Sequence, residues 1–208
     1  MRILYIDTSS SFLYSAITED NDILSEIKEE YGHSLSEVAL PKIVDMFNNN
    51  KLTARDIDKI ILVNGPGSFT GIRIGVTIAK VYAWSLNIPI TTISSLEAMA
   101  LSSLKNTNHV PIINARRGYV FGAIYDKDLN VILKPQHIKL NDLMKEVEKL
   151  NEYEFISNDE FDEDIRVESY NPNISKIVGY FKDKESINPH SVNPEYLKKT
   201  AAEERIND

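Results

Sequence analysis

Two groups of residues in the first third of the chain are suited to holding an anion. The first is Asp7-Thr8-Ser9, directly after the apolar run 3–6, and the second is the glycine-rich run 64–75. A glycine loop that opens a helix can offer backbone N–H groups to an anion, and the helix dipole adds to the attraction. A carboxylate followed by hydroxyls can hold a metal–phosphate group. The candidate anion or nucleotide contacts are Asp7, Thr8, Ser9, Gly67, Ser68, Thr70 and Arg73.

The glycine run does not match the established phosphate motifs. A Walker A loop ends in Gly-Lys-Ser/Thr, whereas Gly71 is followed by Ile72 and Arg73. The dinucleotide fingerprint G-x-G-x-x-G also fails, because the glycines stand at 65, 67 and 71. The alternative is a tight turn whose glycines allow close backbone approach, with Asp7 and its hydroxyl neighbours satisfying local donors. The spacing favours this alternative.

The elements around the glycine run are a buried strand at 59–63 and a helix from about 72 to 86. Small residues recur on this helix every four positions, at Gly71, Gly75, Ala79 and Ala83, and form one stripe that lets another backbone approach closely. The remaining circumference is also largely apolar, which predicts burial on more than one side. One side should lie on the sheet. The other side needs an internal helix or another protein, and the pattern leaves both open.

The rest of the first half predicts a mixed sheet with helices packed on it. Strands are expected at 3–6, 12–18 and 22–29, with a hairpin turn at 19–22, and another strand at 89–93. The sequences at 34–37 and 94–97 are capping boxes that should open helices reaching Phe47 and Leu104. The predicted order is β-β-β-α-β-α-β-α.

The second half begins with the same pattern of strands joined by tight turns and then a helix. Strands are predicted at 110–114, 119–125, 131–133 and 153–157, helices at 140–150 and 175–184, and an extended segment at 189–194. The acidic run 158–168 is predicted to be a loop. We therefore expect a structural repeat with domains at 1–105 and 106–188, and a C-terminal tail, 189–208, that packs back on the first domain.

Composition narrows the function classes. The chain has 208 residues, a formal net charge of −8 and no cysteine. The acidic balance argues against a broad nucleic-acid surface, and the absence of cysteine excludes disulfides, thiolate metal sites and cysteine nucleophiles. The N-terminus lacks the apolar core of a signal peptide, and no run reaches the length of a membrane span. We expect a cytoplasmic protein with no membrane contact.

Several motifs together resemble the TsaB family, also called YeaZ. They are Ile6-Asp7-Thr8-Ser9, His33 with Leu40-Pro41, the block 65–75 (GPGSFTGIRIG) with Ala79-Lys80, Asn114-Ala115-Arg116-Arg117-Gly118, and Pro194-Glu195-Tyr196-Leu197. The likeness covers about the first 125 residues well, the C-terminal segment moderately, and the middle of the second half only in outline. The 65–75 block is long enough to be specific.

The resemblance implies a fold and a role. The fold would be α/β, with two ribonuclease-H-like domains of the actin/Hsp70/sugar-kinase superfamily, the second reduced. The role would be that of a non-catalytic subunit in making N6-threonylcarbamoyladenosine beside the tRNA anticodon. The implied partners are a TsaD-like transferase, a TsaE-like ATPase and a second copy of the chain when it is alone, with tRNA met only through the complex. No cofactor is expected on this chain alone, since ATP and metal would belong to the partner subunits.

The resemblance also implies that a metal site is missing. TsaD-like proteins carry a His-x-x-x-His pair at the start of the helix after the fifth strand. Ser95 and Met99 occupy the two corresponding positions here, and a hydroxyl and a thioether are poor ligands for such metals. The four histidines, at 33, 109, 137 and 190, are scattered along the chain. A metalloprotease is therefore disfavoured.

In the family, TsaB and TsaD join through helices of their first domains. We expect the small-residue stripe and the apolar face of the 34–47 helix to bind either the TsaD-like partner or a second copy. The interface residues predicted on this basis are Leu35, Val38, Ala39, Gly71, Ile72, Gly75, Val76, Ala79, Tyr82 and Ala83. A glutamate at Ala79 or Ala83 should then abolish the association and leave the fold intact.

Two alternatives stay open. The chain could be a nucleotide-dependent kinase or ATPase that uses Asp7 and the 65–71 loop, although fold alone does not give function and the short second half leaves little wall for an adenosine pocket. Arg116 and Arg117 could touch tRNA or form a solvated turn, and we favour the turn.

Overall fold

We analysed a computed structural model that describes residues 1–163 and 165–198. The strands are β1 (Arg2–Asp7), β2 (Phe12–Glu19), β3 (Asp22–Glu30), β4 (Lys59–Val63), β5 (Ile90–Ile93), β6 (Asn108–Asn114), β7 (Tyr119–Tyr125), β8 (Val131–Lys139), β9 (Tyr153–Ile156) and β10 (Val167–Glu168). The α-helices are α1 (Leu35–Asn49), α2 (Phe69–Leu86), α3 (Ser95–Ser102), α4 (Leu140–Val147) and α5 (Ile174–Phe181), and the short 3-10 helices are η1 (Gly32–Ser34), η2 (Ala54–Asp56) and η3 (Pro189–Ser191). None of the helices in these residues is long and apolar enough to cross a membrane.

The chain forms two compact units. The first comprises Met1–Ala98 and Pro172–Pro194, and the second comprises Met99–Asn171 and the segment that starts at Glu195. These limits differ from the 1–105 and 106–188 suggested by the sequence. The difference arises because α5 packs on β1 and β3, where its apolar side chains are buried. The tail 189–208 was expected to pack on the first domain, but it lies with the first unit only as far as Pro194; residues 195–198 belong to the second unit, and 199–208 lie outside the described residues.

Each unit contains one five-stranded sheet, and the two sheets share one topology. The first has the order β3-β2-β1-β4-β5 and the second the order β10-β9-β6-β7-β8. In both, three consecutive strands pair antiparallel and two later strands add in parallel beside the first of them. This confirms the predicted α/β class, the mixed sheets and the repeat. The second copy is reduced, since β10 has only 2 residues.

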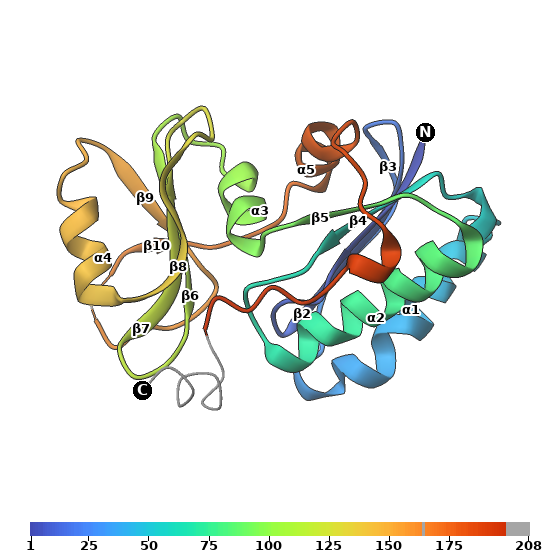
Figure 1. Cartoon of the computed structure of the whole chain (residues 1–208), viewed down its shortest axis with the longest axis horizontal. Helices are drawn as coiled ribbons and strands as arrows, with labels where there is room; N and C mark the ends of the chain where they lie inside the picture. The colour runs from blue at the N-terminus through green and yellow to red at the C-terminus, as the bar shows by residue number, and fades with distance from the viewer. Residues whose placement is uncertain (164, 199–208) are drawn as a thin grey trace. The chain divides into compact units, whose positions relative to one another are not determined.

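Helices cover both faces of the first sheet. Figure 1 shows α1 and α2 side by side on one face, and α5 lies against β1 and β3. The central strands β1 and β4 are buried on both faces, as expected for a covered parallel pair. Because side chains alternate along a strand, Leu4 and Leu62 join the core beneath α1 and α2, while Ile3 and Ile61 point to the other face.

The small-residue stripe of α2 faces this chain's own sheet. A Cβ at Gly75 would lie 2.5 Å from Oγ1 of Thr8 and 3.4 Å from Cδ1 of Leu62. Ala79 and Ala83 are fully buried in the same core. The close approach that the stripe predicted is therefore made to β1 and β4. Because Ala79 and Ala83 are fully buried, we now expect a glutamate at either position to disrupt the fold and not to leave it intact.

Neither predicted capping box forms. The chain enters α1 through η1, and the Ser34 hydroxyl donates to the carbonyl oxygen of Tyr31 at 2.8 Å, so it caps no helical N–H. Helix α3 begins at Ser95, whose hydroxyl donates to the carbonyl oxygen of Pro66. The Ser94 hydroxyl is buried, with no hydrogen-bond partner among the described residues. The capping motif therefore predicted the first residue of both helices to within one position, but the predicted side-chain hydrogen bonds to the helix N-terminus do not form.

The second unit has a core between its sheet and α4. Val110, Ile112, Val120 and Ile124 from the sheet pack with Leu143 and its neighbours on α4. Figure 1 shows α4 lying beside this sheet. Strand β8 continues to Lys139, beyond the predicted end, and β10 lies at the end of a segment predicted to be loop. The predicted extended segment 189–194 contains the single turn η3.

Candidate functional site

The two loops predicted to hold an anion lie against each other. The backbone N–H of Ser68 donates to the carbonyl oxygen of Ser9 at 2.7 Å, and the Thr8 hydroxyl donates to that of Gly71 at 2.8 Å. A Cβ at Gly67 would overlap the Ser9 carbonyl, so only glycine allows this approach. The structure thus brings together Asp7, Thr8, Ser9, Gly67 and Ser68.

Local partners already occupy several donors of this loop pair. Ser68 is the N-cap of α2, and its hydroxyl accepts from the Gly71 N–H at 3.2 Å. Arg73 lies outside the loop contact, with its guanidinium 3.8 Å from the centre of the Phe69 ring, and Thr70 is exposed. The geometry therefore favours a tight structural joint between β1 and α2, which was the alternative that the spacing favoured.

Asp7 is buried at the centre of this joint. Its Oδ1 accepts from the Ser9 backbone N–H at 2.8 Å and from the Ser9 hydroxyl at 2.7 Å. Loss of hydration by burial raises the pKa of Asp7, and the hydrogen bonds from Ser9 and Tyr5 oppose that rise. The carboxylate acts here as the acceptor that closes the turn after β1.

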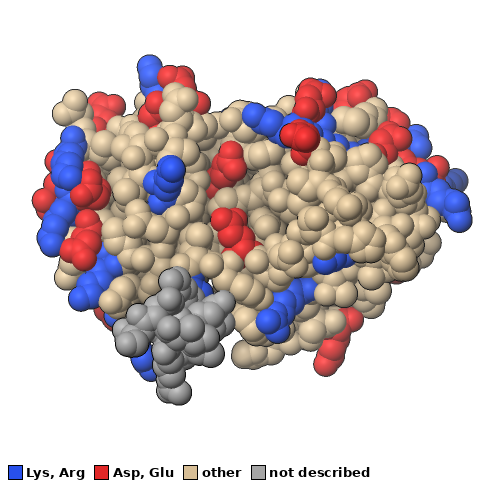
Figure 2. Space-filling model, in the orientation of Figure 1, with Lys and Arg blue, Asp and Glu red and all other residues tan. Residues whose placement is uncertain are grey.

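The exposed surface of α1 and α2 carries large apolar side chains. Trp84 is 65% exposed, Val81 56% and Phe69 53%, and Leu40 and Val44 on α1 are 45% and 40% exposed. The two helices pack against each other, with Phe47 and Tyr82 stacked between them at 6.2 Å. Figure 2 shows a largely uncharged surface where α2 lies. Several exposed large apolar side chains on two packed helices are typical of a protein-binding face. We call Leu40, Val44, Phe69, Val81 and Trp84 the helical face.

The residues predicted at a partner interface lie beneath this surface. Val38 and Tyr82 are half-buried, and the others are buried in the first unit: Leu35, Ala39, Gly71, Ile72, Gly75, Val76, Ala79 and Ala83. The helical face itself was missed. Its α2 residues Val81 and Trp84 lie roughly opposite the small stripe on a helical wheel, so orienting the stripe toward the sheet would have found them.

The C-terminal segment of the first unit borders the helical face. The His190 ring makes an edge contact with Trp84 at 6.0 Å, and the Lys80 ammonium donates to the His190 carbonyl oxygen at 3.2 Å. Asn64 holds the same segment through a 3.0 Å bond to the carbonyl oxygen of Asn193, and Val192 is fully buried. Trp84 is thereby held at one end while most of its surface stays exposed.

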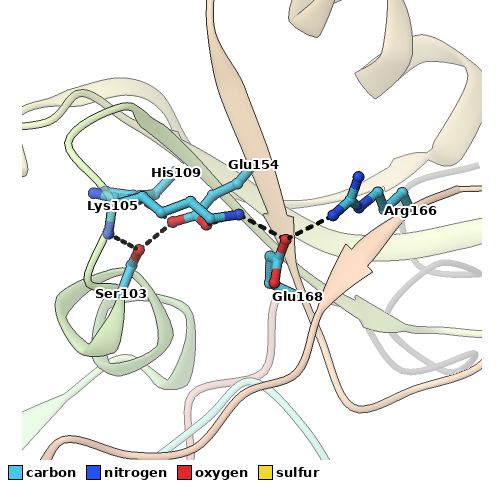
Figure 3. A network of polar contacts seen from close by, with 6 residues as sticks. All are labelled: Ser103, Lys105, His109, Glu154, Arg166 and Glu168. Atoms are coloured by element: carbon cyan, nitrogen blue, oxygen red, sulfur yellow. Dashed lines mark hydrogen bonds and ion pairs between the residues drawn. The ribbon is translucent and has the colours of Figure 1, made fainter.

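A polar network in the second unit centres on the buried carboxylate of Glu154 (Figure 3). Its Oε1 accepts from the Ser103 hydroxyl and lies 2.9 Å from Nδ1 of His109. Lys105 reaches Oε2 of Glu154 at 3.4 Å and Glu168 at 2.6 Å, and Arg166 adds a 4.0 Å contact to Glu168.

This network holds segments together and does not resemble a nucleophilic site. Ser103 and His109 both meet the same carboxylate, whereas activation of a serine requires the imidazole to lie between hydroxyl and carboxylate. The contacts join the turn after α3 to β6, β9 and β10. Sequence reasoning missed the network because His109 and Glu154 are 45 positions apart and no local pattern links them.

The positions that hold metal ligands in TsaD-like proteins have structural roles here. Ser95 is buried and bonded to Pro66, and Met99 is buried in the apolar interior. Among residues 1–163 and 165–198, no three His, Asp or Glu side chains gather in a way that could hold a metal ion.

Comparisons with known proteins agree with the resemblance. The family model "TsaD: tRNA N6-adenosine threonylcarbamoyltransferase" matches residues 23–176. The tRNA threonylcarbamoyladenosine biosynthesis protein TsaB of Bacillus subtilis (strain 168) is 33% identical over 221 aligned residues, which cover 98% of this chain and 96% of that protein. Its namesake in Escherichia coli (strain K12) is 33% identical over 135 residues, 64% of this chain and 58% of that protein.

A solved structure shares the fold. YeaZ from Pseudomonas aeruginosa superimposes with a TM-score of 0.74 over 94% of this chain and 99% of that chain, at 16% identity.

Proposed function

Because this chain belongs to the TsaB family, we propose that it acts in tRNA threonylcarbamoyladenosine biosynthesis as a non-catalytic subunit that binds and supports a TsaD-like transferase. The transferase would catalyse threonylcarbamoyl transfer to the N6 of the adenosine beside the anticodon. This chain would supply a docking surface. A TsaE-like ATPase would join through the same assembly, and tRNA would reach this chain only within it.

The single observation that carries this proposal is the helical face. Trp84 and Val81 stand more than half exposed on a helix whose opposite side is fully packed on the sheet. A tryptophan beside aliphatic side chains is a typical anchor of a protein interface. In the absence of the partner, the same face of a second copy would cover it, so we propose a homodimer for the isolated chain.

The roles of ATP and metal follow from the same reasoning. Local bonds occupy the Asp7 carboxylate and the N–H groups of Ser68 and Gly71, and Ser95 and Met99 stand where imidazoles would be needed. We therefore assign ATP and metal to the partner subunits. The same bonds argue against the alternative of a nucleotide-dependent kinase or ATPase. A tRNA-modifying assembly would work in the cytoplasm.

Binding of the partner tests the proposal. Val81→Asp with Trp84→Asp should weaken association with the TsaD-like subunit by at least about 100-fold in calorimetry, since two anchors become charged. Both side chains are exposed, so urea unfolding should change little. Val131→Asp with Ile132→Asp is the matched control, because these residues are 52% and 50% exposed in the second unit. Equal affinity of the wild type and the Val81/Trp84 variant would refute the proposed surface.

A further inference from the structure

The turn between β6 and β7 has an unusual backbone. Arg116 and Arg117 have φ values of 66° and 57°, and Gly118 follows at 73°. These φ values lie in the left-handed region, which residues other than glycine, asparagine and aspartate seldom adopt. Backbone strain from such conformations is concentrated at functional positions. A hairpin turn that only had to reverse the chain would be better served by Asn-Gly than by two arginines.

The turn is held firmly in this conformation. The Asn114 side chain accepts from the Arg116 N–H at 2.8 Å, and the N–H groups of Ala115 and Tyr119 donate to the carbonyl oxygens of Tyr119 and Arg116. Asn114 is itself anchored, since its backbone N–H donates to Asp159 at 2.7 Å. The first residue of α4 donates to the Gly118 carbonyl at 2.9 Å. The two arginines thus project from a rigid base.

The guanidinium groups are available for an anionic ligand. Arg116 and Arg117 are exposed, and neither forms an ion pair with a carboxylate of the described residues. Two adjacent free guanidiniums are notable on a chain whose formal charge is −8. The planar fork of arginine fits phosphate oxygens two at a time, which lysine does not do.

A small cavity adjoins the two arginines. It has a volume of about 200 Å³ and is lined by Arg116, Arg117, Tyr119, Phe161, Asp162 and Glu163, among others. The Tyr119 ring already stacks on His137 at 4.7 Å, which leaves Phe161 as the ring that an unpaired base could pack against. Carboxylates accept hydrogen bonds from base amino groups, so such a lining suits one base. A simple phosphate ion would gain nothing from the rings and would be repelled by the carboxylates.

We propose that the β6–β7 turn is an RNA-binding site, in which Arg116 and Arg117 hold the phosphodiester of a single-stranded segment and the adjoining cavity takes one unstacked base. This inference rests on the proposed function, since it gives this chain a direct contact with the tRNA of the assembly. It also revises the view of the turn as merely solvated. The other source of the same chemistry is a free nucleotide.

The test compares variants that keep the turn but lose the charges. Arg116→Asn with Arg117→Gly places residues that tolerate left-handed backbone, so the variant should fold and melt no lower than the wild type. Lys127→Ala with Lys134→Ala is the control, because it removes two exposed positive charges from the same unit. Binding of a labelled, unmodified tRNA transcript is measured with the full chain, alone and with the TsaD-like subunit, over a salt series.

The arginine variant should bind the transcript about 100-fold more weakly, since each lost charged contact is worth roughly tenfold or more. The slope of log affinity against log salt should fall by about 1.4, from two contacts on single-stranded RNA. The lysine variant should keep the wild-type slope. Arg116→Lys with Arg117→Lys should recover the slope but only part of the affinity.

Three results would overturn the inference. The first is an arginine variant that binds the transcript with unchanged affinity and slope, and the second is a wild type that binds none either alone or in the assembly. The third is complete displacement of the transcript by equimolar AMP or GMP, which would assign the cavity to free nucleotides. Partner association is recorded separately by size exclusion, so that failure of the docking surface is distinguishable from failure of this site.

Discussion

Replacing Gly71 with alanine would have two opposing effects on the free energy of unfolding. Gly71 lies in the first turn of α2, where intrinsic helix propensity favours alanine by about 1 kcal/mol. A helix that presented this stripe to solvent or to a partner would therefore gain stability from the substitution. A helix that presses the stripe onto its own sheet would lose stability.

The contacts around Gly71 show that the substitution should lower the free energy of unfolding. A Cβ at Gly71 would overlap the backbone carbonyl oxygen of Thr8, closer than the 3.0 Å that real Cβ atoms keep, and would lie 3.2 Å from Cβ of Ser68. The carbonyl belongs to buried backbone and cannot rotate away. The helix must shift, which breaks or lengthens the Thr8–Gly71 and Ser68–Ser9 hydrogen bonds. Two such losses, at about 1–3 kcal/mol each, outweigh the propensity gain of about 1 kcal/mol and give a net destabilisation of about 1–5 kcal/mol.

Urea unfolding followed by circular dichroism measures the change. Gly179→Ala is the matched control, because Gly179 lies in α5 and a Cβ there would lie 3.6 Å from Oδ1 of Asn21, an ordinary contact distance. The control should be more stable than the wild type by about 0.5–1 kcal/mol. A Gly71→Ala protein as stable as that control would refute the packing of the stripe on β1.

Other substitutions test the buried polar groups and the corrected interface. Asp7→Asn should be more stable than the wild type at neutral pH, because burial raises the folded-state pKa of Asp7 and the charged form therefore destabilises the folded protein. The Asn oxygen can still accept the hydrogen bonds from Ser9. The difference in unfolding free energy should vanish as the pH falls below the ordinary pKa of 3.8, which urea unfolding from pH 3 upward measures. Glu154→Ala should destabilise the second unit by about 1–3 kcal/mol, since it leaves buried donors without an acceptor, whereas Lys105→Ala, at an exposed side chain, should change the unfolding curve far less. Ala79→Glu should prevent cooperative folding in a thermal scan, because it buries a charge without a partner; a soluble, cooperatively melting protein would contradict the assigned core.

Much of the fold followed from hydrophobic periodicity. The apolar run that became β4 was predicted to the residue, and the end of α2 was predicted correctly while its start lies three residues earlier than expected, because a buried strand and a long apolar helix leave strong patterns. The equivalence of the two sheets was also visible as repeated hairpins. Strand β10 was not, since 2 residues in an acidic segment carry no period.

The candidate site was harder to predict, for a specific reason. Helix α2 is apolar around most of its circumference, so its sequence could not tell which stripe faced the sheet and which faced outward. Only the packing of Gly71 and Gly75 on Thr8 assigns the inner side and leaves Val81 and Trp84 outside. The left-handed arginines were equally hidden, because the sequence of a turn does not report its φ angles when glycine or asparagine is absent from the strained positions.

Reconstitution of tRNA modification shows whether this chain acts by docking the transferase through its helical face. The cognate TsaD-like and TsaE-like subunits, a source of the threonylcarbamoyl group and an unmodified tRNA are combined with the wild-type chain, with the Val81→Asp/Trp84→Asp variant, or with no third subunit. Threonylcarbamoyladenosine should form only with the wild type, and no product should form when this chain acts without the transferase. Full activity of the variant, or product formed by this chain and tRNA without the transferase, would contradict a docking subunit that works through its helical face.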